Sequence, residues 1–375
     1  MNILLLEPYF TGSHASWADG YVKHSGHQVE IFKLQGYYWK WRMHGGAVTL
    51  AKKLMKSDFQ PDLILATDML DLTTFLSLTR KKTKNVPTIV YFHENQLTYP
   101  WSPVDVDVAL KRDNHYSFIN YTSALAADAV FFNSAYHHQS FLTALPRFLQ
   151  QFPDHNELQT VMEIEEKSYV LPLGIDLQMF DRYKPYWLPV NEVPLLLWNH
   201  RWEYDKNPQE FFEALYLLAA KGVDFELAIL GEQFSQQPKI FHQAQKRLKD
   251  KILHYGFVEN FATYAKWVWR ADILPVSSKQ DFFGGSVVHG IYCNCFPIIP
   301  NRLAYPEHIP EEYKNQHLYD SFEDFVIRLE DAIINIDQTR NREVQDYVSR
   351  YDWRTVAPLY DETFERVLKQ YHSIY

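Results

Sequence analysis

Three short apolar runs decide the fold: Leu63-Ile-Leu-Ala-Thr67, Thr88-Ile-Val-Tyr-Phe92 and Ala129-Val-Phe-Phe132. None of them alternates strictly between apolar and polar residues, which is the pattern of parallel strands buried on both faces. Helix-period stretches lie between them, at 47–55 and 116–127. We therefore predict an α/β domain with a doubly wound parallel sheet. Its other strands are expected to begin at Ile3, Val29 and Tyr169.

The same pattern restarts after a proline-rich stretch with Pro185, Pro189 and Pro194. Strand-like runs at 195–198, 225–230, 252–257 and 271–278 alternate with helical stretches at 208–221 and 240–248. A chain of 375 residues is long enough for two domains. We expect an N-terminal Rossmann-like domain at 1–182, a second one at 190–350, and an amphipathic C-terminal helix at 353–375 packed on the first. Residues 148–167 fit neither series and are expected to form an exposed insertion.

The composition excludes several classes of protein. Apolar residues make up 46% and charged residues 22%, which is globular. The net charge of −9 argues against a wholly basic nucleic-acid binder, although residues 1–84 carry 11 Lys+Arg against 7 Asp+Glu, a balance of +4. No apolar run is long enough to span a membrane, and the N-terminus lacks a signal peptide's basic region. Cys293 and Cys295 allow no disulfide framework, so we expect a reduced, cytoplasmic protein.

Polar residues follow two strands of the first half. In Glu7-Pro-Tyr-Phe-Thr-Gly12-Ser13-His14, small residues precede a helix start that attracts negative charge, although a plain turn is equally open. His93-Glu94-Asn95-Gln96 directly follows a buried strand. Ligands of open α/β sheets bind at that edge, so four polar side chains there favour a binding role over a structural one.

The second half carries cationic and glycine-rich segments after its strands. Arg201 offers a planar fork and Lys206 a point charge, and both suit a pyrophosphate, although a solvated loop is the alternative. Gly284 and Gly285 leave backbone N–H groups bare at a helix start, which makes an anion site or a simple turn. Asp281 can accept a hydrogen bond from a sugar hydroxyl.

Aromatic and cationic residues alternate in Trp39-Lys40-Trp41-Arg42, which suits stacking on unpaired bases with contacts to phosphates. The alternative is a buried aromatic turn beside solvated helix faces. Asp105-Val-Asp107 has the DxD spacing of some metal-dependent transferases, but it lies in a proline-flanked loop. None of the sixteen histidines belongs to an HExxH motif or a closely spaced ligand set, so no metal is predicted.

These strings resemble a known family. The segments 201–206, 231–232, 255–257 and 281–284 are similar to motifs of the retaining glycosyltransferases of family 4. That family has the GT-B fold, with two facing Rossmann-like domains, doubly wound parallel sheets and a C-terminal helix that crosses back. Further strings resemble the tRNA-queuosine α-mannosyltransferase subfamily, namely 7–14, 92–97, 131–134, 200–202 and 292–297.

The resemblance implies a retaining, metal-independent mannosyl transfer from GDP-mannose to queuosine in the anticodon of tRNA of the tRNA-Asp type, with no cofactor besides the donor. Its catalytic residues would be Arg201 and Lys206 at the departing diphosphate, and His93 and Glu94 beside the sugar. Its donor-binding residues would be Gly12, Ser13, Asn199, Gly231, Glu232, Phe257, Asp281, Phe283, Gly284, Gly285, Ser286 and His289. Its acceptor-binding residues would be His14, Trp17, Trp39, Lys40, Trp41, Arg42, Asn95 and Gln96.

One departure from the family pattern is informative. Family 4 has a Glu-x7-Glu pair, where this chain has Asp281 and His289. An imidazole cannot replace a bidentate carboxylate at the ribose. Two alternatives therefore stay open: a different nucleotide sugar with a small or lipid-linked acceptor, and a non-catalytic protein that binds nucleotide sugar or RNA. No membrane contact and no obligate protein partner are expected.

Overall fold

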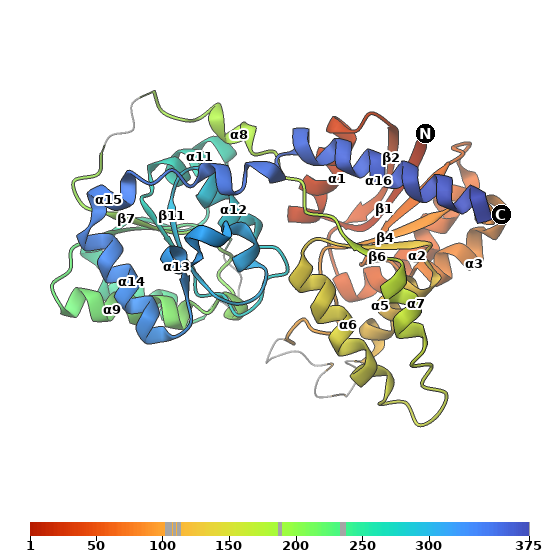
Figure 1. Cartoon of the computed structure of the whole chain (residues 1–375), viewed down its shortest axis with the longest axis horizontal. Coiled ribbons are helices and arrows are strands. Elements are labelled where there is room, and N and C mark those ends of the chain that lie inside the picture. The colour runs from red at the N-terminus through yellow and green to blue at the C-terminus, as the bar shows by residue number, and fades with distance from the viewer. Residues whose placement is uncertain (102–106, 108–109, 111–113, 187–189, 233–237, 375) are drawn as a thin grey trace. The chain divides into compact units, whose positions relative to one another are not determined.

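The computed structural model describes residues 1–375 except 102–106, 108–109, 111–113, 187–189, 233–237 and 375. The chain forms two compact units (Figure 1): unit 1 is Met1–Ile175 with Trp353–Tyr375, and unit 2 is Asp176–Asp352. Unit 1 thus ends earlier than the predicted boundary at residue 182. The reason is Phe180, which is buried, packs on Phe261 of unit 2, and accepts a hydrogen bond from the Trp269 indole.

Unit 1 is built on a six-stranded parallel sheet in the order β2-β1-β3-β4-β5-β6. Its strands are β1 (Asn2–Phe10), β2 (Gln28–Gln35), β3 (Leu63–Thr67), β4 (Thr88–Phe92), β5 (Ala129–Phe132) and β6 (Ser168–Val170). Every residue of β3, β4 and β5 is buried. Burial on both faces explains why these strands show no alternation in the sequence, and each predicted strand start is met within one residue.

Helices cover both faces of this sheet. They are α1 (Gly12–His24), α2 (Trp39–Lys56), α3 (Leu72–Thr83), α5 (Asn114–Ala126), α6 (Ala135–Leu149), α7 (Thr160–Glu166) and α16 (Trp353–Ile374). Helix α2 begins earlier than predicted, so the aromatic and cationic run at 39–42 is its first turn. The predicted insertion at 148–167 is also wrong in part, because α7 packs its buried Ile164 into the core of unit 1.

Unit 2 contains a second six-stranded parallel sheet in the order β12-β11-β10-β7-β8-β9. Its strands are β7 (Leu195–Trp198), β8 (Glu226–Ile229), β9 (Ile252–Tyr255), β10 (Ile273–Pro275), β11 (Phe296–Pro300) and β12 (Leu318–Tyr319). Its helices are α8 (Gln178–Asp181), α9 (Pro208–Ala220), α10 (Ile240–Arg247), α11 (Phe261–Arg270), α12 (Gly285–Tyr292), α13 (Lys314–His317), α14 (Phe322–Ile334) and α15 (Ile336–Arg340). Cys293 and Cys295 are free and buried.

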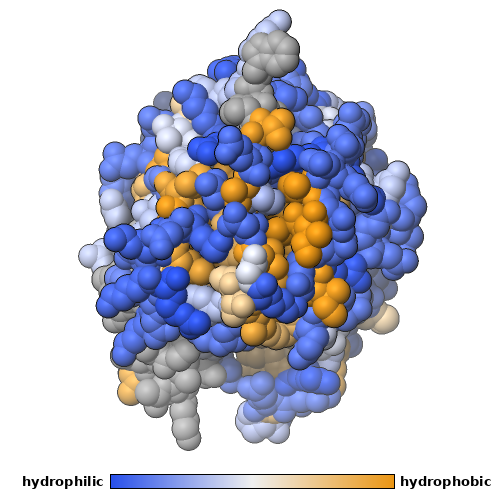
Figure 2. All heavy atoms as spheres, turned by 90° about the vertical axis from the view of Figure 1, so that its left-hand side faces the viewer, coloured by the Kyte–Doolittle hydropathy of each residue, from blue (hydrophilic) through white to orange (hydrophobic). Residues whose placement is uncertain are grey.

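Unit 2 also presents an apolar patch on its surface. Figure 2 shows apolar side chains gathered on the side of the unit where α9 and α14 lie. Exposed apolar residues on these two helices include Leu217, Ile327 and Ile334. These helices cover a face of the sheet, so the patch lies away from the carboxyl ends of the strands. Among the described helices, none combines the length and apolarity that crossing a membrane requires.

The C-terminal helix α16 completes the core of unit 1. Its Trp353 is buried and lies where side chains of Gly20 and Gly174 would otherwise be: a Cβ on Gly20 would meet the indole Nε1 at 2.0 Å, and one on Gly174 would meet the ring at 2.5 Å. Further along the helix, the Tyr360 hydroxyl accepts from Trp17 Nε1 and donates to the Pro172 carbonyl. Glycine at these two positions therefore lets α16 approach the sheet.

Gly20→Ala should destabilise unit 1, because the added methyl group overlaps the Trp353 ring. Overpacking of this kind costs about 1–3 kcal/mol, which urea unfolding followed by tryptophan fluorescence would measure. Gly26→Ala is the matched control, since a Cβ there meets only Asp361 Oδ2 at 3.4 Å. Equal stability of the two variants would contradict the packing argument.

Candidate active site

His93 follows β4 directly and lies in a closed aromatic environment. Its ring is 4.6 Å from Trp17, 4.9 Å from Tyr91 and 4.3 Å from His14, measured between ring centroids. The side chain is buried, yet among the described residues neither ring nitrogen has a hydrogen-bond partner. Buried polar atoms are normally satisfied. A buried imidazole with both nitrogens unsatisfied is therefore the strongest sign of a ligand site in unit 1.

A buried ion pair lies beside His93. Glu7, on β1, accepts a hydrogen bond from His14 Nδ1 at 3.0 Å through its Oε2 and from the Tyr9 backbone N–H through Oε1. Burial lowers the pKa of His14, but the Glu7 carboxylate outweighs burial and raises that pKa to about 9. Burial likewise raises the pKa of Glu7, and His14 outweighs it, so the net pKa is below its usual value. The pair is thus an imidazolium and a carboxylate at neutral pH.

Burial and this ion pair together keep His93 uncharged. Burial and then the positive charge of His14 hold the pKa of His93 well below its usual value, so His93 is neutral. Asp68 Oδ1 lies 3.5 Å from His93 Nδ1, but that oxygen accepts the His93 backbone N–H instead. Burial raises the pKa of Asp68 to about 7. Asp68 directly follows β3, and the sequence analysis missed it although the strand-end rule applies to it.

The residues after His93 shape the loop. Asn95 Oδ1 accepts from the backbone N–H groups of Leu97 and Thr98 and so closes a turn, while its Nδ2 is buried without a partner among the described residues. Gln96 Nε2 donates to Glu94 Oε1. Glu94 is the most exposed of the predicted group of four. The structure thus brings the side chains of Glu94 and Gln96 together, while Asn95 closes the turn.

Two predicted acceptor residues are buried. Trp17 is 1% exposed, stacks on Tyr91 at 4.8 Å and donates to Tyr360, so its side chain supports His93 and cannot meet a macromolecule. His14 is also buried, and its Nδ1 is used by Glu7. Helix α1 thus turns both side chains inward, and the acceptor-binding role expected of them stays a prediction. Gly12 and Ser13, at the exposed start of α1, remain accessible.

The same cluster includes a possible set of metal ligands, contrary to the expectation that no close set exists. Glu7, His14 and His93 offer ligand atoms that all lie within 4.8 Å of one another. Their sequence spacing hides this because they come from β1, α1 and the end of β4. Of the DxD pair, Asp105 lies outside the described residues, and Asp107 bonds to Lys40 and Tyr116.

The aromatic and cationic segment at the start of α2 is only partly exposed. Trp39 packs against Tyr116 at 5.1 Å, Lys40 Nζ lies 2.5 Å from Asp107 Oδ2, and Arg42 Nε donates to the Gln35 carbonyl. Trp41 is the exception and is 63% exposed. Three of the four side chains thus have partners within unit 1, and the stacking and phosphate contacts expected of this segment stay a prediction.

In unit 2, residues after β7 meet the start of α12. Asn199 Nδ2 donates to the Ser286 carbonyl at 2.7 Å, and His200 Nδ1 lies 2.9 Å from Ser286 Oγ. Burial lowers the pKa of His200 to about 4, so it is neutral, and its Nε2 is buried with no partner among the described residues. His200 stands within a predicted string, but it was not singled out. His200 thus follows a strand end and keeps one ring nitrogen without a partner among the described residues.

Lys206 is buried among acceptors. Its Nζ lies 3.0 Å from Asp281 Oδ2 and 3.2 Å from Asp205 Oδ2, and it donates to the Gln280 carbonyl. Burial lowers the pKa of Lys206, but Asp281 and then Asp205 outweigh burial and raise it. Asp281 also accepts from the Tyr305 hydroxyl at 2.6 Å. The cation is thus fixed in place by two carboxylates and one backbone carbonyl, which come from its own neighbour Asp205 and from residues 280–281.

The remaining predicted donor residues fall into two groups. Gly231 allows a close backbone approach, since a Cβ there would lie 1.9 Å from the His200 carbonyl oxygen, and Gly284 precedes α12 in the left-handed conformation with φ of 86°. Glu232 and Phe257 are exposed, whereas Phe283 is buried between His308 and Tyr351 and offers a ligand only its backbone.

His289 and Arg201 complete the set. His289 Nδ1 lies 3.2 Å from the Tyr264 hydroxyl, and burial lowers the pKa of this histidine to about 4. Arg201 is half-exposed and pairs with Glu203 at 3.1 Å. Gly285 is the first residue of α12, beside Ser286. Unit 2 therefore gathers Asn199, Lys206, Asp281, Ser286 and His289 at the carboxyl edge of its sheet.

Comparison with known proteins assigns the chain to a class. Residues 180–345 match the family described as glycosyl transferases group 1. Two solved structures are similar over almost the whole chain: sucrose-phosphate synthase from Thermosynechococcus elongatus (TM-score 0.73, 13% identity, 99% of this chain and 100% of that one) and Anabaena HepE in complex with UDP (0.68, 16%, 98% and 100%). The fold is GT-B, and the chain is a glycosyltransferase.

The first unit makes the assignment narrower. Residues 2–175 match the N-terminal domain described for tRNA-queuosine alpha-mannosyltransferase. The protein of that name from Drosophila melanogaster is 34% identical over 318 residues, which are 83% of this chain and 82% of that protein. This chain belongs to the tRNA-queuosine alpha-mannosyltransferase family.

The Glu7–His14 ion pair makes a prediction about pH. Because the folded pKa of His14, about 9, lies above its usual value of 6.5, the pair's contribution is complete below pH 6.5. It declines as the pH rises and is lost above about 9. We expect wild type to lose at most about 3 kcal/mol of unfolding free energy through this pair between pH 6.5 and 9.

His14→Gln is the matched variant, since it keeps a hydrogen-bond donor but no titratable charge. Urea unfolding of both proteins at pH 6.5, 7.5 and 9 would give the slope of unfolding free energy against pH for each of them. Because all other titrating groups are shared, a slope in His14→Gln as steep as that of wild type would rule out the charged pair.

Proposed function

We propose that this chain transfers mannose from GDP-mannose to queuosine in a tRNA anticodon, with retention at the anomeric carbon and without a metal. The observation that carries the proposal is the match of unit 1 to the N-terminal domain of a tRNA-queuosine alpha-mannosyltransferase. The matched residues include the cluster in which His93 keeps both ring nitrogens unsatisfied. A neutral imidazole of this kind can donate to one sugar hydroxyl and accept from another.

On the donor side, unit 2 would bind the nucleoside diphosphate. Lys206 supplies a fixed positive charge, and Arg201 adds a mobile guanidinium that can leave Glu203 for a phosphate oxygen. The start of α12, with Gly284, Gly285 and Ser286, adds backbone N–H groups that favour negative charge. Stabilising the charge that grows on the departing diphosphate is then the main source of rate enhancement.

His289 would take the position that a glutamate occupies in related enzymes. It is neutral, and the Tyr264 hydroxyl lies 3.2 Å from its Nδ1. A neutral imidazole can make one hydrogen bond to a ribose hydroxyl through its other nitrogen. Binding of the ribose would thus rest on one hydrogen bond where a carboxylate makes two, and the diphosphate contacts carry more of the affinity.

On the sugar side, the neutral His93 would hold hydroxyl groups of the transferred mannose. A neutral imidazole offers one donor and one acceptor, and the imidazolium of His14, with its ring centroid 4.3 Å away, keeps it in this state. The Asn133 side chain donates to the His93 carbonyl and fixes the loop. No protein nucleophile is needed, because the leaving phosphate can assist attack on the same face.

The first test is the reaction itself. Purified protein with labelled GDP-mannose should transfer mannose to tRNA that contains queuosine and not to the same tRNA lacking it, and mass analysis of the nucleosides would identify the product. EDTA should leave the rate unchanged. Labelling of both tRNAs, or of neither, would refute the acceptor. Loss of activity in EDTA, restored by added metal, would instead point to the triad of Glu7, His14 and His93.

Lys206→Met should lower kcat by about 100- to 1,000-fold, the range observed when one charge-stabilising group is removed. Lys279→Met is the matched control, since Lys279 is exposed and its replacement should leave kcat unchanged. Because Asp281 and Asp205 would both lose their partner, Lys206→Met combined with Asp281→Asn and Asp205→Asn keeps the site free of an unpaired charge. Turnover close to wild type in the folded triple variant would exclude the role of Lys206.

A further inference from the structure

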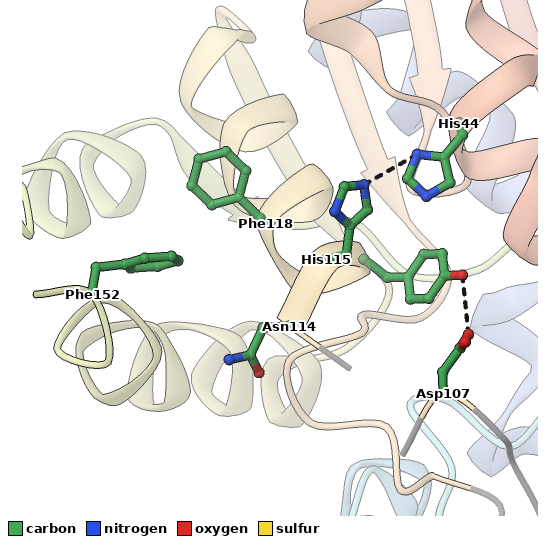
Figure 3. A pocket seen from close by; sticks show the side chains of 7 residues that line it. His44, Asp107, Asn114, His115, Phe118 and Phe152 are labelled. Atoms are coloured by element: carbon green, nitrogen blue, oxygen red, sulfur yellow. Dashed lines mark hydrogen bonds between the residues drawn. The ribbon is translucent and has the colours of Figure 1, made fainter. Parts of the chain in front are cut away.

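A pocket of about 590 Å³ lies in unit 1, apart from the cluster around His93. It is lined by His44 of α2, by Asp107, by the first residues of α5 and by Phe152 (Figure 3). Its volume is in the range of sites that hold a small molecule or a single side group, about 300–1,000 Å³. The mechanism proposed above makes no use of it.

The pocket joins aromatic faces with polar edges. Figure 3 shows Phe118 and Phe152 at one end, the pair His44 and His115 at the other, and Asn114 at the first turn of α5. The two phenylalanine rings are 5.8 Å apart and meet edge to face. Phe118 is 44% exposed. A ring of this exposure can stack on a flat aromatic ligand without a rearrangement of the core.

The two histidines add a defined hydrogen-bonding pattern. His115 Nε2 lies 3.3 Å from His44 Nδ1, so one ring donates to the other. Burial, and then His115, lower the pKa of His44, which favours its neutral form. Whichever ring of a neutral pair donates, the two outer nitrogens comprise one donor and one acceptor. With the Asn114 amide nearby, this is the complement of a nucleobase edge.

Helix α5 also ties the pocket to His93. Ser117 Oγ donates to the Gln96 carbonyl, and Asn120 accepts from the Gln96 backbone N–H while it donates to the Asp68 carbonyl. Asp68 in turn holds the His93 backbone. The helix that lines the pocket and the loop that carries His93 are therefore held together by hydrogen bonds within unit 1.

The charges around the pocket are mixed. The first turns of α2 and α5 contain no acidic residue, and the first turn of α2 carries Lys40 and Arg42, while Asp107 of the pocket lining pairs with Lys40. Helix starts attract phosphate groups. Apolar acceptors such as lipid chains would gain nothing from the histidine pair, whereas unpaired bases of RNA are recognised by stacking and by hydrogen bonds to their edges.

We propose that this pocket binds an unpaired nucleobase of the acceptor RNA, adjacent in the strand to the nucleoside that receives the sugar. The proposal rests on the proposed function for the identity of that nucleoside. The base stacks on Phe118, and the pair of His44 and His115 contacts its edge. The pocket thus makes the enzyme select a loop of RNA over a free nucleoside.

The test compares Phe118→Ala with Tyr169→Ala, a matched control because Tyr169 is 47% exposed and does not line the pocket. Phe118→Ala should weaken binding of an anticodon stem-loop RNA, followed by fluorescence anisotropy, by about 5- to 100-fold, the range for loss of one stacked base. The KM for tRNA should rise to a similar extent, with kcat and the KM for GDP-mannose unchanged. Tyr169→Ala should match wild type.

The pocket's role would be overturned if folded Phe118→Ala and wild type bound the RNA equally well, or if Phe118→Ala and Tyr169→Ala lost RNA affinity to the same extent. It would be overturned as well if Phe118→Ala reduced transfer to free queuosine nucleoside as strongly as transfer to tRNA. Binding of wild type to lipid vesicles that Phe118→Ala abolishes would also overturn it. His115→Gln should weaken RNA binding less than Phe118→Ala and tests the edge contact separately. If wild type fails to mannosylate tRNA, the proposed function fails, while the stem-loop binding still decides the pocket.

Discussion

The site in unit 1 depends on one buried ion pair, Glu7 with His14. Two charges inside a protein are costly unless they compensate each other, and here each outweighs the burial of the other. The ion pair affects the neighbouring ring, which is that of His93. Burial and then the neighbouring imidazolium lower the pKa of His93, so its ring stays neutral and can both donate and accept. In the proposed reaction, the ion pair would influence a ligand through His93 without contacting the ligand itself.

Much of this arrangement could be predicted from the sequence, because a parallel sheet places its functional residues by a simple rule. Burial on both faces makes each strand a continuous apolar run, and β3, β4 and β5 were visible for that reason. Strand ends then mark the site, as His93 after β4 and Asn199 after β7 show. Strands β11 and β12 escaped notice, since Phe296–Pro300 contains two prolines and Leu318–Tyr319 is only two residues long.

What could not be predicted is the direction of side chains and the partners they find. Trp17 and Trp41 are both aromatic residues near helix starts, yet one is buried under His93 and the other is exposed. The difference is set by α16, whose Tyr360 accepts from Trp17 after more than three hundred intervening residues. Pairing at such separations leaves no local signal. The same holds for the pocket, whose walls come from α2, α5 and residue 152.

The two units prepare their sites in a similar way. In unit 2, Asp281 and Asp205 raise the pKa of Lys206 and so keep it charged in the absence of a ligand, just as Glu7 raises the pKa of His14. Such groups do not reorganise when charge develops, and this is the condition under which electrostatic stabilisation is most effective. It also carries a cost. A diphosphate near Lys206 must compete with Asp281, which keeps the Tyr305 hydroxyl as a second donor. That second donor lets Asp281 share Lys206 with an anion without becoming an uncompensated buried charge.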